Sequence, residues 1–493
     1  MRVSELYNLG RNQSSLDFLD INLATDIPVF LDASAIRSLQ IPWGHELRAI
    51  LDDFFGLVLR CIREGRDDDA QRLLASLSES NEYRLGLSAG RSQGYAFGTE
   101  SAENVWSALT DEDGEVADLL TTIEDSILLV RGVGSDMVSD AICNILRGPF
   151  IRFTQDACVY YGIPLTSEVH SGPIWNLERH CWEETLVDLP VHDTFGKFIL
   201  VPKNIVRHKV TCNSHSYYRH FLLPVMGRHE VASRTSIVQY RRNNQPFVTK
   251  KDLMEKYGAD KLAVVQQTKR YPEALQAYKR TVGATPKPPL THNEVSDCVH
   301  EERTNWQDFI DELEALPTGQ EHASAYEDLI ERIFSALFYP SLCFPSKQVD
   351  IHDRRKRIDI TYANEAKSGF FYWIQAQFPS LFIIVECKNY SGEVANAEVD
   401  QLAGRFSPSR GQVGLLVYRS VSNRPRLEAR CKDTAVDRRG WIVSLSDEDV
   451  IALIREKERE ENVNTLDADE VQPSDFTKSK YTRLREKMTA LVN

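Results

Sequence analysis

The stretch that most constrains this chain is the run 381–388, Leu-Phe-Ile-Ile-Val-Glu-Cys-Lys. Its apolar, β-branched and aromatic start, preceded by Pro379, predicts a short and largely buried β-strand. Because strand side chains alternate between faces, Glu386 and Lys388 project from one side and Cys387 from the other. Two charges at the end of a buried strand are costly unless they have a partner, such as a metal ion, a phosphate or each other. We therefore expect a polar site at this end of the strand.

Two upstream segments carry further acidic residues. Residues 325–334 have apolar side chains at three- and four-residue steps, which predicts a helix with Glu327 near the edge of its buried face. Residues 354–360, Arg-Arg-Lys-Arg-Ile-Asp-Ile, place Asp359 between two isoleucines on a predicted neighbouring strand. Downstream of the Glu-x-Lys strand, residues 394–406 predict another helix. Two more predicted strands, at 411–418 and 441–445, and a closing helix at 447–454 follow.

This order resembles the PD-(D/E)xK nuclease superfamily, which has the restriction-endonuclease-like fold. The resemblance covers residues 321–455, and Asp359, Glu386 and Lys388 match the signature that names the superfamily. Ile358 stands in the position of the name-giving proline. Glu327 matches the acidic residue often found on the first helix of this fold. Gln401 matches the polar residue often found on the helix after the signature. Arg405 stands where some branches have a tyrosine, so the branch is left unassigned.

The resemblance implies a Mg²⁺-dependent phosphodiesterase, in which Mn²⁺ can replace Mg²⁺. The implied metal ligands are all oxygen donors: the carboxylates of Asp359, Glu386 and Glu327 and the backbone carbonyl of Cys387. Lys388 would orient or deprotonate the attacking water, and Gln401 would position the substrate or Lys388. Hard divalent ions prefer such oxygen ligands.

The predicted fold class is α/β, with several domains. A chain of 493 residues is expected to hold two to four domains. Three prolines within 286–289 predict a linker. The expected N-terminal region at 1–282 is α+β or mainly α and serves sensing, assembly or substrate binding. A proline-rich linker at 283–300 leads to a nuclease-like domain at 301–455, which has a central mixed sheet flanked by helices. A charged tail at 456–493, with a possible terminal helix, ends the chain.

The net charge of −14 excludes a protein that coats nucleic acid over its whole surface. Contacts to DNA must therefore be local. The candidates are the basic residues that flank the predicted carboxylate site: Arg354, Arg355, Lys356, Arg357, Arg405 and Arg410. A solvated charged face is the commoner fate of such a run, but its position beside Asp359 favours phosphate contact.

The N-terminal region offers weaker motifs. Asp32 ends a predicted strand as in PIN-type ribonucleases, but the other acidic positions of that family are not found. The histidines and cysteines near 208–220 are spaced too irregularly for a typical zinc site. Residues 132–140 predict a helix-capping turn with Ser135 or Asp136 as cap, rather than a phosphate loop. A helix is expected at 115–129.

Nine scattered cysteines favour a reduced compartment, and no apolar run reaches the length of a membrane span. The cytoplasm is the expected location, with no membrane partner. The expected function is a DNA endonuclease, acting as a regulated bacterial defence effector whose N-terminal region binds a partner protein or self-associates. A repair or recombination nuclease and a catalytically silent nucleic-acid-binding scaffold stay open as alternatives.

Overall fold

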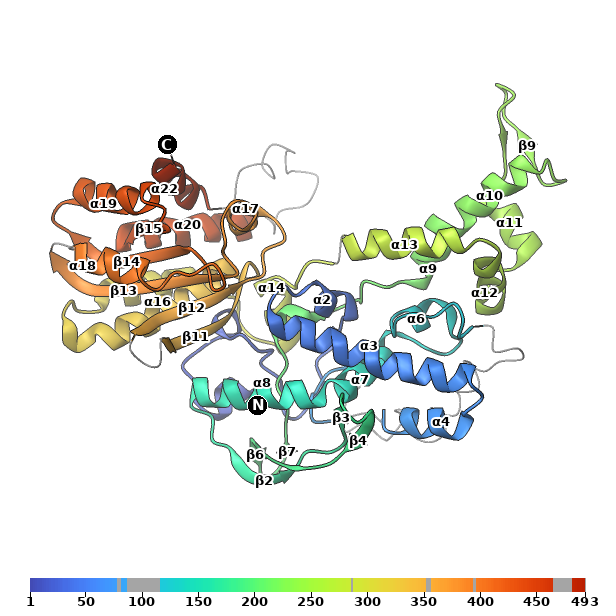
Figure 1. Cartoon of the computed structure of the whole chain (residues 1–493), viewed down its shortest axis with the longest axis horizontal. Coiled ribbons are helices and arrows are strands. Elements are labelled where there is room, and N and C mark those ends of the chain that lie inside the picture. The colour runs from blue at the N-terminus through green and yellow to red at the C-terminus, as the bar shows by residue number, and fades with distance from the viewer. Residues whose placement is uncertain are drawn as a thin grey trace. The chain divides into compact units, whose positions relative to one another are not determined.

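The computed structural model describes residues 1–77, 81–86, 116–284, 287–351, 356–392, 396–463 and 481–492 (Figure 1). These residues form two compact units. Unit 1 consists of Met1–Tyr7 and Ile21–Leu290, and unit 2 of Asn8–Asp20 and Thr291–Asn493. The boundary at residue 290 falls inside the linker expected at 283–300.

Unit 2 is built on a five-stranded mixed sheet, in the order β11-β12-β13-β14-β15. The pairs β11–β12 and β12–β13 are antiparallel, and the pairs β13–β14 and β14–β15 are parallel. Their bounds are Leu342–Ile351 (β11), Lys356–Asn364 (β12), Phe382–Gly392 (β13), Val413–Val421 (β14) and Trp441–Ser446 (β15). The strands predicted from the apolar runs are thus confirmed, and so is a mixed α/β architecture for this region.

Helices cover both faces of this sheet. Ile383, Ile384 and Val385 are consecutive on β13 and all fully buried, which requires apolar cover on both sides because their side chains alternate. The helices of unit 2 are α14 (His292–Val299), α15 (Trp306–Ala315), α16 (Ala323–Phe338), α17 (Gly369–Gln377), α18 (Asn396–Ala403), α19 (Arg424–Val436), α20 (Asp447–Val463) and α22 (Thr482–Val492). The predicted helices near 325–334, 394–406 and 447–454 correspond to α16, α18 and α20.

The expected linker is partly wrong, whereas the terminal helix expected within the tail is confirmed as α22 (Thr482–Val492), which belongs to unit 2. Helix α14 lies inside the stretch expected to be linker, and its His292 Nε2–H donates a hydrogen bond to the Ala336 carbonyl at 2.7 Å. Helix α22 lies inside the expected tail and buries Leu484 and Met488 in the core of the unit. Apolar positions spaced four residues apart explain why α22 packs rather than staying in solvent.

A segment from the start of the chain also belongs to unit 2. Residues 8–20 carry Arg11, whose guanidinium pairs with the fully buried Glu331 carboxylate of α16. The backbone N–H of Phe344 on β11 donates to Asp17 Oδ1 at 3.0 Å. Nothing in the local sequence predicts this placement, because the partners are hundreds of residues away.

Unit 1 is mainly helical, with short two-stranded antiparallel pairs. Its helices are α1 (Val3–Leu6), α2 (Ala33–Ser38), α3 (Pro42–Arg63), α4 (Asp67–Ala75), α6 (Asp125–Leu129), α7 (Ser135–Ile145), α8 (Arg147–Tyr161), α9 (Ser214–Tyr217), α10 (Leu223–Ala232), α11 (Lys250–Tyr257), α12 (Lys261–Arg270) and α13 (Pro272–Ala284), with a π-helical turn at Tyr218–Leu222. Its strands are β1 (Phe30–Leu31), β2 (Thr166–His170), β3 (Ile174–Asn176), β4 (Cys181–Glu183), β5 (Leu186–Leu189), β6 (Val191–His192), β7 (Gly196–Lys197), β8 (Val206–Arg207), β9 (Gln239–Tyr240) and β10 (Pro246–Phe247). None of the helices in the described ranges is long and apolar enough to cross a membrane.

Two local predictions for unit 1 are wrong. The helix expected at 115–129 is reduced to α6, because the Asp125 carboxylate accepts the backbone N–H groups of Thr121 and Thr122 and holds them in a turn. Helix α7 has Gly134 as its N-cap, with no side-chain cap, so Ser135 and Asp136 are its first helical residues.

Candidate functional site

The predicted site residues lie on neighbouring strands of unit 2. Ile360 on β12 pairs with Val385 on β13 in antiparallel register. Continuing this register by one residue sets Asp359 opposite Glu386, where directly opposed side chains share a face. The Glu-x-Lys spacing keeps Lys388 on that face as well. The sheet therefore gathers one aspartate, one glutamate and one lysine.

Glu386 is held between two cations. Its residue is only 1% exposed, and Lys388 Nζ donates to its Oε1 at 2.8 Å. Its Oε2 forms an ion pair with the guanidinium of Arg405, which is itself buried just after α18. Pairing of this kind offsets the cost of placing a carboxylate in the interior.

Asp359 and Glu327 complete the charge cluster. Asp359 Oδ2 accepts the backbone N–H of Cys387 at 3.0 Å. Glu327, on α16, accepts a hydrogen bond from Gln348 Nε2 at 2.6 Å. Burial raises the pKa of Glu327, and the negative charge of Asp359 raises it further. Because Asp359 and Glu327 also act on the pKa of Arg405, which burial lowers, these groups belong to one electrostatic unit.

The donor chemistry of the cluster fits a hard divalent cation, since three carboxylates share a small region. Among the described residues, however, no three His, Cys, Asp or Glu side chains are arranged so that they could hold a metal ion together. The positive charge beside Glu386 comes from Lys388 at Oε1 and from Arg405 at Oε2. A cation at Glu386 would have to replace the Arg405 guanidinium at Oε2.

Other predicted residues are placed less centrally. Gln401 is exposed on α18, and Arg357 is exposed on β12. Arg410 is half-buried and donates to the backbone carbonyl of Arg405 at 3.2 Å. Arg354 and Arg355 lie outside the described residues, as does the side chain of Lys356.

Arg405 differs most from its predicted role. Its place among the basic residues flanking the carboxylates predicted phosphate contact, but its side chain is only 4% exposed and pairs with Glu386. One local signal could have found this position: Arg405 follows the apolar pair Leu402-Ala403 at the end of a helix, and these two neighbours are buried.

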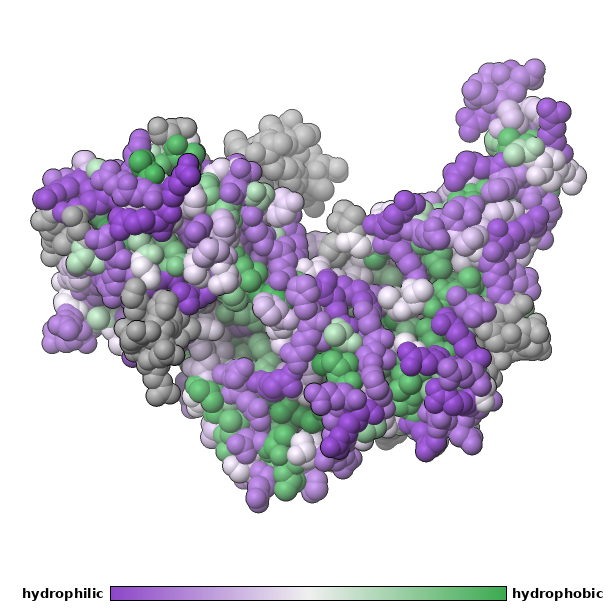
Figure 2. Space-filling model, in the orientation of Figure 1, coloured by the Kyte–Doolittle hydropathy of each residue, from purple (hydrophilic) through white to green (hydrophobic). Residues whose placement is uncertain are grey.

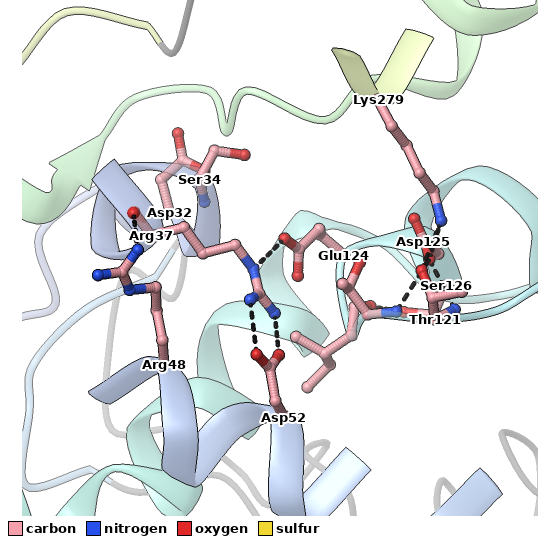
Figure 3. Close-up of polar contacts among 12 residues, drawn as sticks. Asp32, Ser34, Arg37, Arg48, Asp52, Thr121, Glu124, Asp125, Ser126 and Lys279 are labelled. Atoms are coloured by element: carbon pink, nitrogen blue, oxygen red, sulfur yellow. Dashed lines mark hydrogen bonds and ion pairs between the residues drawn. The ribbon is translucent and has the colours of Figure 1, made fainter. Parts of the chain in front are cut away.

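Unit 1 contains a second cluster of buried charges (Figure 3). Asp32 caps α2 by accepting the Ser34 N–H at 3.0 Å, and it also accepts the N–H and hydroxyl of Thr211. Asp125 accepts the N–H groups of Thr121 and Thr122, both at 2.9 Å. These contacts fix a helix start and a turn, which gives Asp32 a structural role in place of the PIN-type one.

The cations in Figure 3 complete this second cluster. Arg37 forms a two-pronged contact with Asp52 and donates through Nε to Glu124 Oε1 at 2.7 Å. Lys279 of α13 donates to Asp125 Oδ2 at 2.6 Å. Burial raises the pKa of Glu124. The nearby histidines and cysteines form no group with metal-binding geometry in the part of the chain that is described.

Comparisons with known proteins concern unit 1 more than unit 2. A search of curated proteins found no match, and a search of solved structures found none either. The sequence model of one protein family, described as a domain of unknown function (DUF8370), matches residues 8–213. This matched range contains the cluster residues from Asp32 to Asp125 and ends before the five-stranded sheet begins. Residues 8–213 of the chain are therefore similar to the DUF8370 family.

Proposed function

We propose that unit 2 is a metal-dependent endonuclease of the PD-(D/E)xK type that hydrolyses phosphodiester bonds of DNA. The observation that carries this proposal is the gathering of Glu386, Lys388 and Asp359 on adjacent strands that follow the Glu327 helix. The element order of unit 2, which is helix α16, strands β11 and β12, helix α17, strand β13, helix α18 and strand β14, supports the proposal.

The chemistry follows from the donors. A divalent ion on the carboxylate oxygens would neutralise phosphate charge and make a water more acidic. The Lys388 ammonium, which is 2.8 Å from Glu386 Oε1, is close enough to orient a water and to balance the charge of the attacked phosphate. Glu386 is only 1% exposed and shares its face of β13 with the fully buried Ile384, which gives this carboxylate a low-dielectric setting where its charge acts strongly.

The wider role is also a proposal. A nuclease attached to a larger unit suits an effector whose cutting is controlled, as in bacterial defence, and unit 1 would then bind the regulating partner. A specific observation supports one alternative, a silent nucleic-acid-binding scaffold. The Arg405 guanidinium is paired with Glu386 Oε2, the oxygen that a metal ion would need.

The test is cleavage of plasmid and linear DNA with Mg²⁺ or Mn²⁺, with EDTA as the metal-free control. Lys388→Ala is expected to lower the rate by about 10²–10⁴-fold. Lys367→Ala is the matched control, because Lys367 is an exposed lysine paired with Glu365 outside the cluster, and it should cut like the wild type. Equal cutting by Lys388→Ala and wild type would refute the site. If no protein cuts with either ion, the scaffold alternative is favoured.

A further inference from the structure

A β-hairpin of unit 1 projects between α10 and α11. Strands β9 and β10 pair Tyr240 with Pro246, and the Arg241 N–H donates to the Gln245 carbonyl at 3.0 Å. Asn244 closes the turn with a φ of 60°, in the left-handed region that asparagine tolerates. Figure 1 shows this hairpin at the far end of the α10–α11 helices.

The hairpin contacts α11 at its base, and its tip is exposed to solvent. Gln239 Nε2 donates to Asp252 Oδ2 of α11 at 2.8 Å, and the Arg241 guanidinium lies over the Phe247 ring. Every residue from 239 to 246 is exposed, and Tyr240 is 62% exposed. An uncovered two-stranded hairpin is only marginally stable in water, so its retention favours a function at the tip.

The hairpin and its flanks are strongly basic, although the chain as a whole has a net charge of −14. Between residues 228 and 251 the cations are Arg228, Arg234, Arg241, Arg242, Lys250 and Lys251. The single acidic residue there, Glu230, is engaged by Lys256, Tyr257 and Thr235, which lower its pKa to about 2 although burial opposes this. Glu230 therefore does not neutralise the hairpin cations. Just past this range, Asp252 accepts the Gln239 amide and Glu255 pairs with Lys251, which leaves Arg241 and Arg242 as the cations of the hairpin itself. Figure 2 shows the projecting end as mainly hydrophilic.

The side chains at the tip carry the chemistry of base-edge recognition. Residues 239–245 read Gln-Tyr-Arg-Arg-Asn-Asn-Gln, so each of them ends in a hydrogen-bonding group. Arginine, asparagine and glutamine are the side chains that form paired hydrogen bonds with guanine and adenine in the major groove. That groove is about 12 Å wide and admits a two-stranded β-ribbon.

We propose that the hairpin 239–247 inserts into the major groove of double-stranded DNA and is the principal DNA contact of unit 1. An anionic membrane is a poorer match, because the tip offers no aliphatic side chain to insert. An acidic protein is a poorer match, because the adjacent donor and acceptor groups of Asn243, Asn244 and Gln245 fit the edges of purine bases. The narrow major groove of A-form RNA excludes such a ribbon. The inference goes beyond the proposed nuclease site and would hold even if unit 2 did not cut.

The experiment measures binding of the full chain to a fluorescent DNA duplex by anisotropy, in EDTA so that cleavage cannot interfere. Arg241→Gln with Arg242→Gln is expected to raise the dissociation constant about tenfold or more. The slope of log affinity against log salt, measured between about 50 and 200 mM, should become shallower by about one to two. Because these side chains are exposed, the variant should fold like the wild type, which circular dichroism verifies.

Two further variants separate the effect of charge from that of the guanidinium group, and the hairpin from other exposed arginines of unit 1. Arg241→Lys with Arg242→Lys retains charge but loses the planar two-pronged donor, so its salt slope should stay near that of the wild type while affinity falls. Arg72→Gln with Arg179→Gln removes two exposed arginines elsewhere in unit 1 and should leave binding unchanged. The proposal is overturned if the Arg241→Gln and Arg242→Gln variant binds within about twofold of the wild type. It is also overturned if the wild type binds no duplex DNA, or prefers double-stranded RNA or anionic vesicles.

Discussion

The two clusters of buried carboxylates differ in what holds them. In unit 1, Asp32 and Asp125 each accept two backbone N–H groups, so each carboxylate ties backbone segments together. In unit 2, both oxygens of Glu386 face side-chain cations, Lys388 and Arg405. Asp359 has a backbone donor, but Glu327 has a side-chain amide.

This difference bears on function. A carboxylate bonded to two backbone N–H groups cannot change partners without opening the backbone that it holds, and such groups stabilise the fold. A carboxylate paired only with side-chain cations can exchange one of them for another cation while the backbone stays in place. Burial alone therefore does not distinguish Glu386 from Asp32 or Asp125, whereas its side-chain partners beside the neighbouring acids Asp359 and Glu327 do.

The largest expected effect concerns Glu331 on α16. This carboxylate is fully buried and has side-chain partners, so it tests whether side-chain pairing alone marks a functional site. Burial opposes its ionisation, but the Arg11 guanidinium holds the pKa of Glu331 below its usual value. Arg11→Gln should cost about 3 kcal/mol in the free energy of unfolding, because it leaves a buried charge underpaired. Urea unfolding measures this. If cleavage per folded molecule also fell, side-chain pairing by itself would mark function, and the requirement for neighbouring acids would be wrong.

A second variant tests the structural half of the comparison. Asp125→Ala removes the acceptor of the Thr121 and Thr122 N–H groups and the partner of Lys279. It should lower the free energy of unfolding by about 2–3 kcal/mol. DNA cleavage per folded molecule should not change. Asp118→Ala is the matched control, since Asp118 is an exposed aspartate paired with Arg63, and it should cost less than about 1 kcal/mol.

Asp449 tests whether the kind of partner, and not the unit, decides the role of a buried carboxylate. It lies in unit 2 but accepts a backbone N–H, that of Ser446. Burial would raise its pKa, but the Ser446 N–H together with Lys487 and Arg483 lowers the pKa of Asp449 to about 2. A depressed folded-state pKa gives stability that is present above the unfolded value and lost as the pH falls through the folded value. The free energy of unfolding of the wild type should therefore exceed that of Asp449→Asn by about 2 kcal/mol at neutral pH. The excess should shrink between about pH 4 and pH 2, and a pH-independent difference would contradict this assignment.

The smallest expected effect concerns Arg405. Arg405→Gln removes the cation that competes for Glu386 Oε2, so the affinity for Mn²⁺ should rise about tenfold, equivalent to about 1.4 kcal/mol. Isothermal titration calorimetry measures it without any cleavage step. Arg439→Gln is the matched control, because Arg439 pairs with the exposed Asp400, and its Mn²⁺ affinity should equal that of the wild type. Unchanged affinity in Arg405→Gln would show that the guanidinium is a fixed structural partner.

The sequence predicted the parts of unit 2 that depend on local pattern. The apolar runs around Ile384 and Leu415 gave the strands, and the two-residue alternation gave the shared face of Glu386 and Lys388. Helix α17 was not predicted, although Phe370 and Ile374 pack into the core, because its apolar run has no single polar face.

The features that sequence reasoning missed depend on distant partners. Arg11 meets Glu331 across 320 residues, and no periodicity signals such a pair. The Arg405 contact likewise depends on how α18 ends beside β13, and a basic residue on a helix is more often exposed. In unit 1 the Asp125 turn replaced an expected helix because side-chain acceptors competed with helical hydrogen bonding.

The most direct test sets Asp359→Asn against Asp32→Asn, the same substitution in the two clusters, and measures the initial rate of plasmid cleavage in Mg²⁺ per folded molecule. The account predicts that Asp359→Asn lowers the rate by about 10²-fold or more, with an unfolding free energy within about 1 kcal/mol of the wild type. Asp32→Asn should cut at the wild-type rate while losing about 1–2 kcal/mol of stability. Equal rates for Asp359→Asn and wild type would contradict the assignment of the carboxylate cluster in unit 2 as the catalytic site.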